Sequence, residues 1–372
     1  MLIGVPKEIK DQEYRVGLVT ASVRELTHHG HQVIVEHDVG RAIGLDDEDY
    51  RAAGAEVVDS AEDVFARADM VVKVKEPLAN ERKMLREGQV LFTYLHLAAD
   101  ADQTRDLVDS GATAIAYETV TDSVGRLPLL APMSEVAGRM SIQAGAHCLE
   151  KAQGGRGVLI GGVPGVPSGD VVILGGGVVG TNAARMAMGM EARVTVLDKS
   201  VRRLAELDMQ FGPMLNTIFA TVEALERYID QADLVVGAVL VPGAETPRLI
   251  SREMVTSMRR GSVIVDVSVD QGGIADTTRP TTHTEPTYIV DEVVHYCVSN
   301  MPGAVARTST FALNNATLPY VLDLADKGWQ GALAADPGFA AGLNVHAGQV
   351  THPAVAQDLD YDYVPAETLF SA

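Results

Sequence analysis

A glycine-rich segment carries the most specific chemical motif of this sequence. Gly175, Gly177 and Gly180 follow the hydrophobic run VVIL, and the helix-forming run TNAARMAMGM comes next. In such a strand–turn–helix unit, the first glycine permits the tight turn and the second lets a pyrophosphate approach the helix N-terminus. The third glycine lets helix and strand pack closely. The alternative is a glycine turn that binds nothing, and the complete context argues against it.

An acidic residue completes this nucleotide motif. Asp198 ends the run ARVTVLD, at about the 20-residue distance that the motif requires. A carboxylate there accepts a hydrogen bond from the ribose 2′-hydroxyl and repels a 2′-phosphate, so the motif predicts NAD rather than NADP. Lys199, Arg202 and Arg203 leave contact with a 2′-phosphate open. Arg203 could equally stack on adenine or lie in solvent.

Three polar side chains follow predicted strands in the first third of the chain. Arg15, Lys75 and His96 would lie at the carboxyl ends of these strands, where ligands of open α/β sheets bind. Arginine grips a carboxylate with two hydrogen bonds, lysine polarises a carbonyl oxygen, and histidine passes a proton near neutral pH. Each also has a plainer explanation: a solvated arginine, a lysine lying along apolar surface, and a core histidine.

Other titratable groups are less specific. Asp270 precedes a glycine turn in VDVSVDQGG, where an acid orients a histidine or a substrate amine, or caps the turn. The group His28, His29 and His31 spans a predicted helix end, and its spacing does not favour a metal site. Asp233 is expected on a solvated face.

The elements that position these residues alternate between strands and helices. Short hydrophobic runs predict strands, and Thr20 to His29 and Glu135 to Ala152 predict helices. After about Arg307 the pattern becomes helical, first over Phe311 to Lys327. The sequence predicts an α/β fold of two doubly wound, Rossmann-like domains with mostly parallel sheets. The predicted strands are 2–5, 32–35, 70–74, 89–94, 113–117, 171–174, 193–197, 234–239 and 262–267.

Composition limits the function further. The 372 residues carry a formal charge of −20, which argues against nucleic-acid binding and against docking on anionic membranes. Two distant cysteines, Cys148 and Cys297, are expected to be buried free thiols in a reducing compartment. Neither a signal peptide nor a membrane-spanning run is recognisable, so we expect a cytoplasmic protein.

Longer segments resemble bacterial alanine dehydrogenase, in the family that it shares with the NAD(H)-binding component of transhydrogenase. The resemblance covers essentially the full chain. The segments that carry it are VPKEIKDQEYRVGLVTASVREL (5–26), VVKVKEP (71–77), FTYLHLAA (92–99), LPLLAPMSEVAGRMS (127–141), GGRGVLIGGVPGV (154–166), VDVSVDQGG (265–273), RPTTH (279–283) and MPGAVARTSTFALNNATLPYV (301–321).

The resemblance implies a reaction and roles for these residues. NAD⁺ takes hydride from Cα of L-alanine, and hydrolysis of the imine releases pyruvate and ammonia, reversibly. Arg15 and Lys75 would bind the substrate, and His96 and Asp270 would be catalytic. Matching cofactor-lining positions are Ser134, Gly175, Gly177, Val178, Val179, Gly180, Asp198, Arg203, Val239, Leu240, Val267, Ser268, Val269, Asp270, Arg279, Val298, Ser299, Asn300 and Met301.

The resemblance also implies an architecture. Residues 1–128 and 307–372 would form a discontinuous substrate domain and residues 129–306 the NAD domain, with the active site in the cleft between them. Family members are usually homohexamers. Two positions depart: Ala220 replaces a frequent serine, and Lys327 replaces a histidine that in some members binds a divalent ion with an acid near Asp323. We therefore predict no metal.

Three other functions fit parts of the sequence. The transhydrogenase component is disfavoured by FTYLHLAA (92–99) and by the absence of a membrane segment. A silent NAD sensor would keep the glycine turn and Asp198 without needing Arg15, Lys75 and His96 together. Saccharopine-type dehydrogenases fit the segments less well.

Overall fold

The computed structural model describes residues 1–239 and 246–370, which divide into two compact units. Unit 1 combines Met1–Met133 with the segment from Val305 onward, and unit 2 comprises Ser134–Ala304. Unit 1 is therefore built from both ends of the chain.

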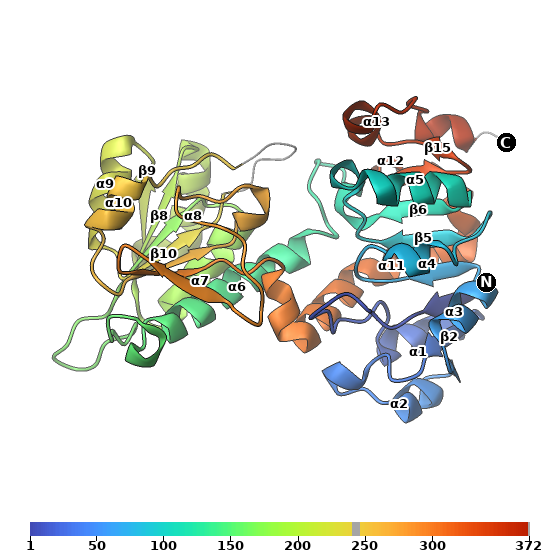
Figure 1. The fold of residues 1–372 in the computed structure, drawn as a ribbon, viewed down its shortest axis with the longest axis horizontal. Helices are drawn as coiled ribbons and strands as arrows, with labels where there is room; N and C mark the ends of the chain where they lie inside the picture. The colour runs from blue at the N-terminus through green and yellow to red at the C-terminus, as the bar shows by residue number, and fades with distance from the viewer. Residues whose placement is uncertain (240–245, 371–372) are drawn as a thin grey trace. The chain divides into compact units, whose positions relative to one another are not determined.

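Unit 1 contains an eight-stranded sheet in the order β15-β14-β6-β5-β4-β1-β2-β3. The strands β6 to β3 run parallel, whereas β14 pairs antiparallel with both β6 and β15. Figure 1 shows these two C-terminal strands, coloured orange to red, beside the N-terminal ones. The strands are β1 (Leu2–Val5), β2 (Gln32–Glu36), β3 (Glu56–Val58), β4 (Met70–Val72), β5 (Val90–Thr93), β6 (Thr113–Ala116), β14 (Leu343–His346) and β15 (Gln349–Val350).

Helices cover both faces of this sheet, because neighbouring strand residues point to opposite sides. Leu91 of β5 belongs to a core with residues of α3, α5 and α13. The next residue, Phe92, packs on Phe339 of α12, which in turn contacts Tyr320 of α11. The helices of unit 1 are α1 (Thr20–His28), α2 (Asp47–Ala52), α3 (Ala61–Arg67), α4 (Ala79–Arg82), α5 (Ala101–Ser110), α11 (Ala306–Ala335), α12 (Pro337–Ala340) and α13 (Pro353–Leu359).

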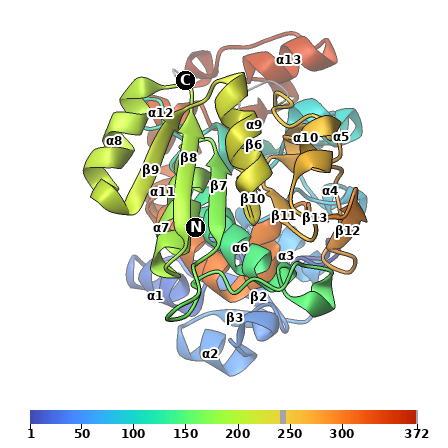
Figure 2. The same cartoon turned by 90° about the vertical axis from the view of Figure 1, so that its left-hand side faces the viewer.

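Unit 2 contains a seven-stranded sheet in the order β12-β13-β11-β10-β7-β8-β9. All neighbours are parallel except the β12–β13 pair. Figure 2 shows β7, β8 and β9 side by side at the front. The strands are β7 (Asp170–Leu174), β8 (Arg193–Asp198), β9 (Leu215–Phe219), β10 (Leu234–Gly237), β11 (Val263–Asp266), β12 (Thr287–Val290) and β13 (Val293–Tyr296).

The central strand β7 shows why helices cover both faces of this second sheet. Val171 and Ile173 lie in a core with α6, α7 and α8, whereas Val172 and Leu174 lie in a core with α9 and α10. A strand that is hydrophobic at every position requires cover on both sides. The helices are α6 (Ala131–Cys148), α7 (Val178–Gly189), α8 (Val201–Phe211), α9 (Val222–Gln231) and α10 (Arg252–Ser257).

The predicted fold class is confirmed, with corrections in detail. The tail after Arg307 is not wholly helical, because β14 and β15 extend the sheet of unit 1 there. Asp233 is 4% exposed and pairs with Arg156 and Arg259, so its expected place on a solvated face is wrong. None of the helices in the described part of the chain combines the length and the apolar character needed to cross a bilayer.

Candidate active site

The glycine turn of unit 2 has the geometry that its sequence predicts. Gly175 has φ +101°, a left-handed conformation that favours glycine. Gly177 is the N-cap of α7, and a Cβ there would meet nothing within 4 Å. A Cβ on Gly180 would lie 1.8 Å from the carbonyl oxygen of Gly175. The three glycines therefore serve the turn, an open approach to the helix N-terminus, and close packing.

Asp198 and Arg203 hold this turn in place. One oxygen of Asp198 accepts the backbone N–H of Gly176 at 2.7 Å, and the other accepts that of Ser200 at 2.7 Å. Arg203 donates from Nε to the carbonyl oxygen of Gly176 at 2.6 Å and from Nη2 to Thr181 Oγ1 at 2.6 Å. The guanidinium of Arg203 is thus bound to the turn and does not lie free in solvent.

The other predicted cofactor positions of unit 2 follow the carboxyl ends of strands in the same sheet. Val239 follows β10, the segment 267–270 follows β11, and the segment 298–301 follows β13. Ser268 Oγ donates to the carbonyl oxygen of Val239 at 2.6 Å, which joins the first two of these turns. Leu240 lies outside the described residues. Because neighbouring parallel strands end at one edge, these segments share the edge that carries the glycine turn.

The remaining expected cofactor positions vary in their surroundings. Ala220 follows β9, and its N–H donates to the carbonyl oxygen of Asp198 at 3.0 Å. The guanidinium of Arg279 lies over the ring of Tyr288, 4.2 Å from its centroid. Ser134 lies partly buried on α6. Val178 and Val179 open α7, with Val178 exposed.

Asp270 lies exposed in the 3₁₀ turn η6 (Val269–Gln271) of unit 2. Asp266, which no motif in the sequence singled out, shapes this turn. Asp266 is buried, and its two oxygens accept the N–H groups of Ser268 at 2.9 Å and Ile274 at 2.7 Å. Burial raises the pKa of Asp266 despite these bonds. Its place at the end of a hydrophobic strand was the available signal.

In unit 1, Arg15 already has a carboxylate partner. Arg15 is 2% exposed, and its Nε and Nη2 donate to Oε1 and Oε2 of Glu13 at 2.7 and 2.6 Å. The two-bond contact that the sequence predicts with a substrate is thus made with Glu13, a residue that no motif singled out. Burial opposes the charge of Arg15, but the hydrogen bonds and charge of Glu13 outweigh it and raise the pKa of Arg15.

Lys75 follows β4, and both its N–H and its carbonyl oxygen are hydrogen-bonded to side chains. Its N–H donates to Glu8 Oε1 at 3.2 Å, and its carbonyl oxygen accepts from Thr93 Oγ1 at 2.9 Å. Across residues 1–239 and 246–370, no hydrogen bond or ion pair occupies its Nζ. Burial, together with the positive charges of Arg15 and Lys10, lowers the pKa of Lys75 although Glu76 opposes this. The positive charges of Lys75 and Arg15 therefore repel each other.

A second lysine nearby has a different environment. Lys73 is completely buried, and its Nζ contacts Glu8 at 3.2 Å and Glu81 at 2.7 Å. Glu8 also accepts the N–H of Val74 at 2.7 Å. Lys73 is therefore part of a buried ionic group under the turn, whereas the ammonium of Lys75 has no such partner among the described residues.

His96 follows β5 and is half exposed. Its backbone has φ +53°, which is uncommon for a residue with a side chain. Its ring stacks on Tyr94, with centroids 5.9 Å apart and planes 2° from parallel. The hydroxyl of Tyr94 donates to the carbonyl oxygen of Leu129 at 2.6 Å. Arg15, Lys75 and His96 follow β1, β4 and β5, which are neighbouring strands of one sheet.

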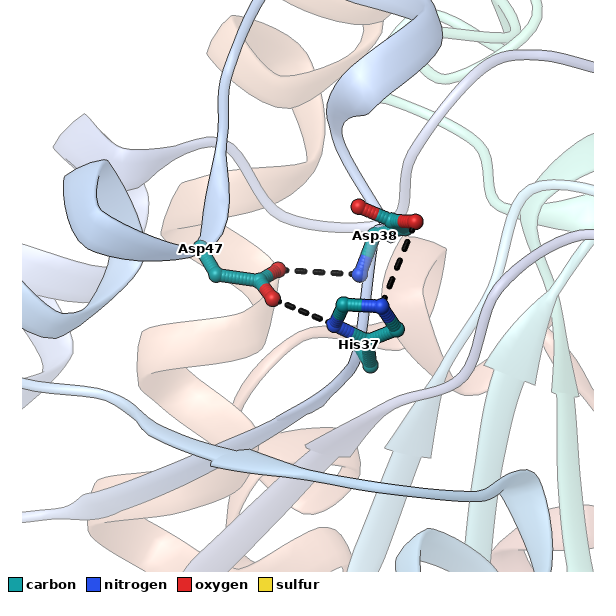
Figure 3. A group of neighbouring side chains, drawn as sticks. All are labelled: His37, Asp38 and Asp47. Atoms are coloured by element: carbon teal, nitrogen blue, oxygen red, sulfur yellow. Dashed lines mark hydrogen bonds and ion pairs between the residues drawn. The ribbon is translucent and has the colours of Figure 1, made fainter.

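Figure 3 shows a cluster with metal-ligand chemistry in unit 1, formed by His37, Asp38 and Asp47. Nδ1 of His37 lies 2.5 Å from Asp47, and Nε2 lies 3.3 Å from Asp38. Arg41 also pairs with Asp38 at 3.2 Å. Each ring nitrogen of His37 therefore faces a different carboxylate.

Two further polar groups involve α11. His29 Nδ1 and His31 Nε2 lie 3.1 and 2.7 Å from the two oxygens of Asp326. Near them in the chain, Lys327 Nζ lies 2.8 Å from Asp323. The ammonium of Lys327 thus occupies one carboxylate oxygen of Asp323.

Comparison with known proteins gives matches over nearly the whole chain. The family model "Alanine dehydrogenase/PNT, N-terminal domain" matches residues 4–137, and "Alanine dehydrogenase/PNT, C-terminal domain" matches residues 141–353. Alanine dehydrogenase of Halomonas elongata is 59% identical over 369 residues, which are 99% of this chain and 100% of the relative. That of Mycolicibacterium smegmatis is 53% identical over 366 residues, 98% and 99% of the two chains.

Comparison with solved structures also gives matches over nearly the whole chain. An L-alanine dehydrogenase structure has a TM-score of 0.95 and 55% identity, and covers 97% of this chain and 99% of its own. A transhydrogenase from Sinorhizobium meliloti has a TM-score of 0.81 and 25% identity, and covers 95% of this chain and 100% of its own.

Proposed function

The chain belongs to the alanine dehydrogenase/PNT family, and we propose that it is an oxidoreductase that converts L-alanine reversibly into pyruvate and ammonia with NAD. The observation that carries this proposal is the 59% identity to an alanine dehydrogenase along the whole chain. The positions of Arg15, Lys75 and His96 after neighbouring strands of one sheet support this proposal.

The glycine turn and Asp198 fit NAD. The space beside Gly177 admits a pyrophosphate to the N-terminus of α7, where free N–H groups and the helix dipole favour an anion. The carboxylate of Asp198 suits a ribose 2′-hydroxyl and repels a 2′-phosphate. When bound, NAD⁺ supplies the hydride acceptor. Residues 267–270 and 298–301, with Ser134, Val239, Leu240 and Arg279, are proposed to complete the cofactor site.

Arg15 and Lys75 are proposed to bind the substrate. The guanidinium of Arg15, oriented by Glu13, attracts the carboxylate of alanine or pyruvate. The ammonium of Lys75 stabilises negative charge that develops on the carbonyl oxygen. Both charges are removed from bulk water, which strengthens their action on a small ligand.

His96 is proposed as the acid and base of the reaction. Its imidazole accepts a proton from the water that attacks the imine carbon, and then returns a proton as ammonia leaves. Asp270 of unit 2 is proposed as its catalytic companion. The predicted position of the active site in an interdomain cleft stays a prediction.

The transhydrogenase component is the competing function within this family. The Sinorhizobium meliloti match supports a common fold and a related sequence, at 25% identity. Identities of 53% and 59% to alanine dehydrogenases favour the dehydrogenase.

We also propose that the protein forms homo-oligomers in the cytoplasm. Three large apolar side chains of the loop before β7, Leu159, Val163 and Val166, are more than half exposed, and such surface favours association. Cys148 and Cys297 are free thiols, which are typical of a reducing compartment. A homohexamer is the state expected from the family resemblance.

The first experiment measures NADH formation by the purified protein with NAD⁺ and L-alanine at alkaline pH. NADP⁺, glycine and L-serine are tested in parallel. Rapid NADH formation with alanine and NAD⁺ alone supports the reaction, the cofactor and a small side-chain pocket. Tight NADH binding without turnover would contradict the proposal and favour a transhydrogenase-like or sensor function.

A further inference from the structure

The main chain at His96 is fixed by a carboxylate from a neighbouring strand end. The N–H of His96 donates to Glu118 Oε1 at 2.6 Å, and the N–H of Leu95 lies 3.2 Å from both oxygens of Glu118. The side chain of Glu118 is 13% exposed, so little water competes for these bonds. They hold His96 at φ +53°, a conformation that a histidine rarely adopts without support.

The sheet explains how Glu118 reaches this position. Glu118 lies in the 3₁₀ turn η3 (Tyr117–Thr119) directly after β6. Strands β5 and β6 are parallel neighbours, with Thr93 paired to Ala116. Their carboxyl ends therefore lie side by side, and the turn after β6 faces the turn after β5.

The same carboxylate lies near the imidazole itself. Oε1 of Glu118 is 3.8 Å from Nδ1 of His96, while Tyr94 stacks on the ring. Hydrogen bonds of catalytic groups are often long without substrate and shorten when it binds. The proton on a histidine is placed by the partner of its other nitrogen. In the part of the chain that the structure describes, Nε2 of His96 has no hydrogen-bond partner.

We propose that Glu118 is a positioning residue for His96. Its carboxylate fixes the left-handed main chain and favours the proton on Nδ1, which leaves Nε2 to exchange a proton with water or substrate. This inference rests on the proposed function, in which His96 is the acid and base. If Glu118 only capped the turn, it would still accept hydrogen bonds from the main chain. The orientation of the His96 ring would then not depend on it.

Glu118→Ala, His96→Ala and the double variant test the proposal. We expect Glu118→Ala to lower kcat for NAD-dependent alanine oxidation by about 10- to 100-fold, as expected for a misplaced catalytic group. Because the glutamate acts through the histidine, Glu118→Ala should cause no further loss when added to His96→Ala. Equal fold losses in both backgrounds, or a kcat within twofold of wild type for the single variant, would overturn the proposal.

Conservative variants of Glu118 distinguish a loss of His96 positioning, which lowers kcat, from a loss of folding, which lowers Tm. Glu118→Gln keeps an oxygen that accepts the N–H of His96, so it should recover most of the lost kcat with an unchanged Tm. Should Glu118→Ala fail to fold, Glu118→Asp withdraws the carboxylate by one methylene and should lower kcat in its place. The control Glu62→Ala, at an exposed position of α3, should leave kcat unchanged. A Glu118→Asp enzyme with wild-type kcat would also overturn the proposal.

Hydrogen exchange in the protein without cofactor gives a readout that does not depend on activity. A peptide containing Leu95 and His96 should exchange its amides faster in Glu118→Ala than in wild type, and near the wild-type rate in Glu118→Gln. Unchanged exchange would contradict the main-chain role. If wild type lacks alanine-dependent turnover, the proposed function fails, and the exchange measurement still decides whether Glu118 holds His96.

Discussion

The carboxylate of Asp198 accepts a hydrogen bond from the backbone N–H of Gly176 at 2.7 Å. The acid at the end of β8 therefore touches the glycine turn after β7, which is the neighbouring strand. A ribose hydroxyl would approach the same carboxylate, while Arg203 holds the opposite side of Gly176 through its carbonyl oxygen. We therefore propose that the one side chain of Asp198 both shapes the turn and selects the cofactor.

Asp198→Ala should weaken NADH binding and reduce selectivity against NADPH. Loss of a hydrogen-bond acceptor for buried donors costs about 1–3 kcal/mol, or roughly 5- to 150-fold in Kd. Fluorescence titration with NADH and NADPH measures both effects. Asp198→Asn isolates the charge, because it keeps an oxygen but no longer repels a 2′-phosphate. Continued exclusion of NADPH by Asp198→Asn would contradict the electrostatic explanation.

Gly180→Ala should destabilise unit 2. The added Cβ would lie 1.8 Å from the carbonyl oxygen of Gly175, so α7 and β7 must separate. Such overpacking costs about 3 kcal/mol or more, which corresponds to a Tm lower by about 6–12 °C. Differential scanning calorimetry measures this change.

Gly177→Ala is the matched control for that variant. Its Cβ would meet nothing within 4 Å, and its φ of −66° suits alanine, so Tm should stay near the wild-type value. The methyl group would occupy the approach to the helix N-terminus, and NADH binding should weaken. Equal Tm values for the two variants would show that the close contact at Gly180 is relieved without cost.

Features encoded within a short stretch of chain were predictable. The glycine turn combines a strand, a turn and a helix start in one segment, and its three glycines have the predicted geometry. The N-cap of α3 is equally local, because the side chain of Ser60 accepts the N–H of Asp63 at 3.2 Å. Continuous hydrophobic runs such as Val171–Leu174 predicted central strands, because burial on both faces leaves no polar position.

Features that depend on contacts between residues far apart in the sequence were not predictable. Nothing local shows that Glu8 reaches Lys73 across 65 residues, or that Asp233 lies beneath Arg156 and Arg259. Strands β14 and β15 are short, and they become strands through the pairing of β14 with β6 and of β15 with β14. Glu13 and Glu118 belong to no sequence motif. Their roles follow from the contacts that they make with Arg15 and His96 in the folded chain.

His96→Ala should lower kcat for alanine oxidation by about 10²- to 10⁴-fold, because the variant lacks the proposed acid and base of the reaction. NADH affinity should survive, since the glycine turn and Asp198 belong to unit 2. Steady-state kinetics and NADH titration measure the two quantities. His147→Ala, at an exposed position of α6, is the control and should keep wild-type kcat. Wild-type turnover by His96→Ala would refute the role of this residue.

Chelation should leave activity and stability unchanged. The ammonium of Lys327 lies 2.8 Å from Asp323 and supplies the positive charge that a divalent ion would bring. We therefore expect kcat and Tm to be the same with EDTA and with millimolar Mg²⁺. Lys327→His removes this ammonium, and Mg²⁺ should then raise its Tm. A Tm of wild type that rises with Mg²⁺ would contradict the prediction.

Pyruvate binding should decline at alkaline pH because Lys75 loses its proton. Burial, with help from Arg15 and Lys10, lowers the pKa of Lys75, so the ammonium is lost below the usual value of about 10.4. Kd for pyruvate, titrated into the enzyme–NADH complex without ammonium, should therefore rise as the pH passes through that lowered pKa. Lys75→Arg stays charged at every such pH and should lose this dependence.

The same lowered pKa predicts an effect of Lys75 on stability. The proton binds Lys75 more weakly in the folded than in the unfolded protein, so below both pKa values the charge opposes folding. Lys75→Met should therefore raise the free energy of unfolding at pH 7, and the gain should shrink as the pH rises through the folded pKa. Denaturant unfolding at pH 7 and pH 10 measures this difference. The variant should also lose pyruvate affinity, as expected when a binding site retains a costly charge. A Lys75→Met protein that is less stable than wild type at pH 7 would show that Lys75 stabilises the fold.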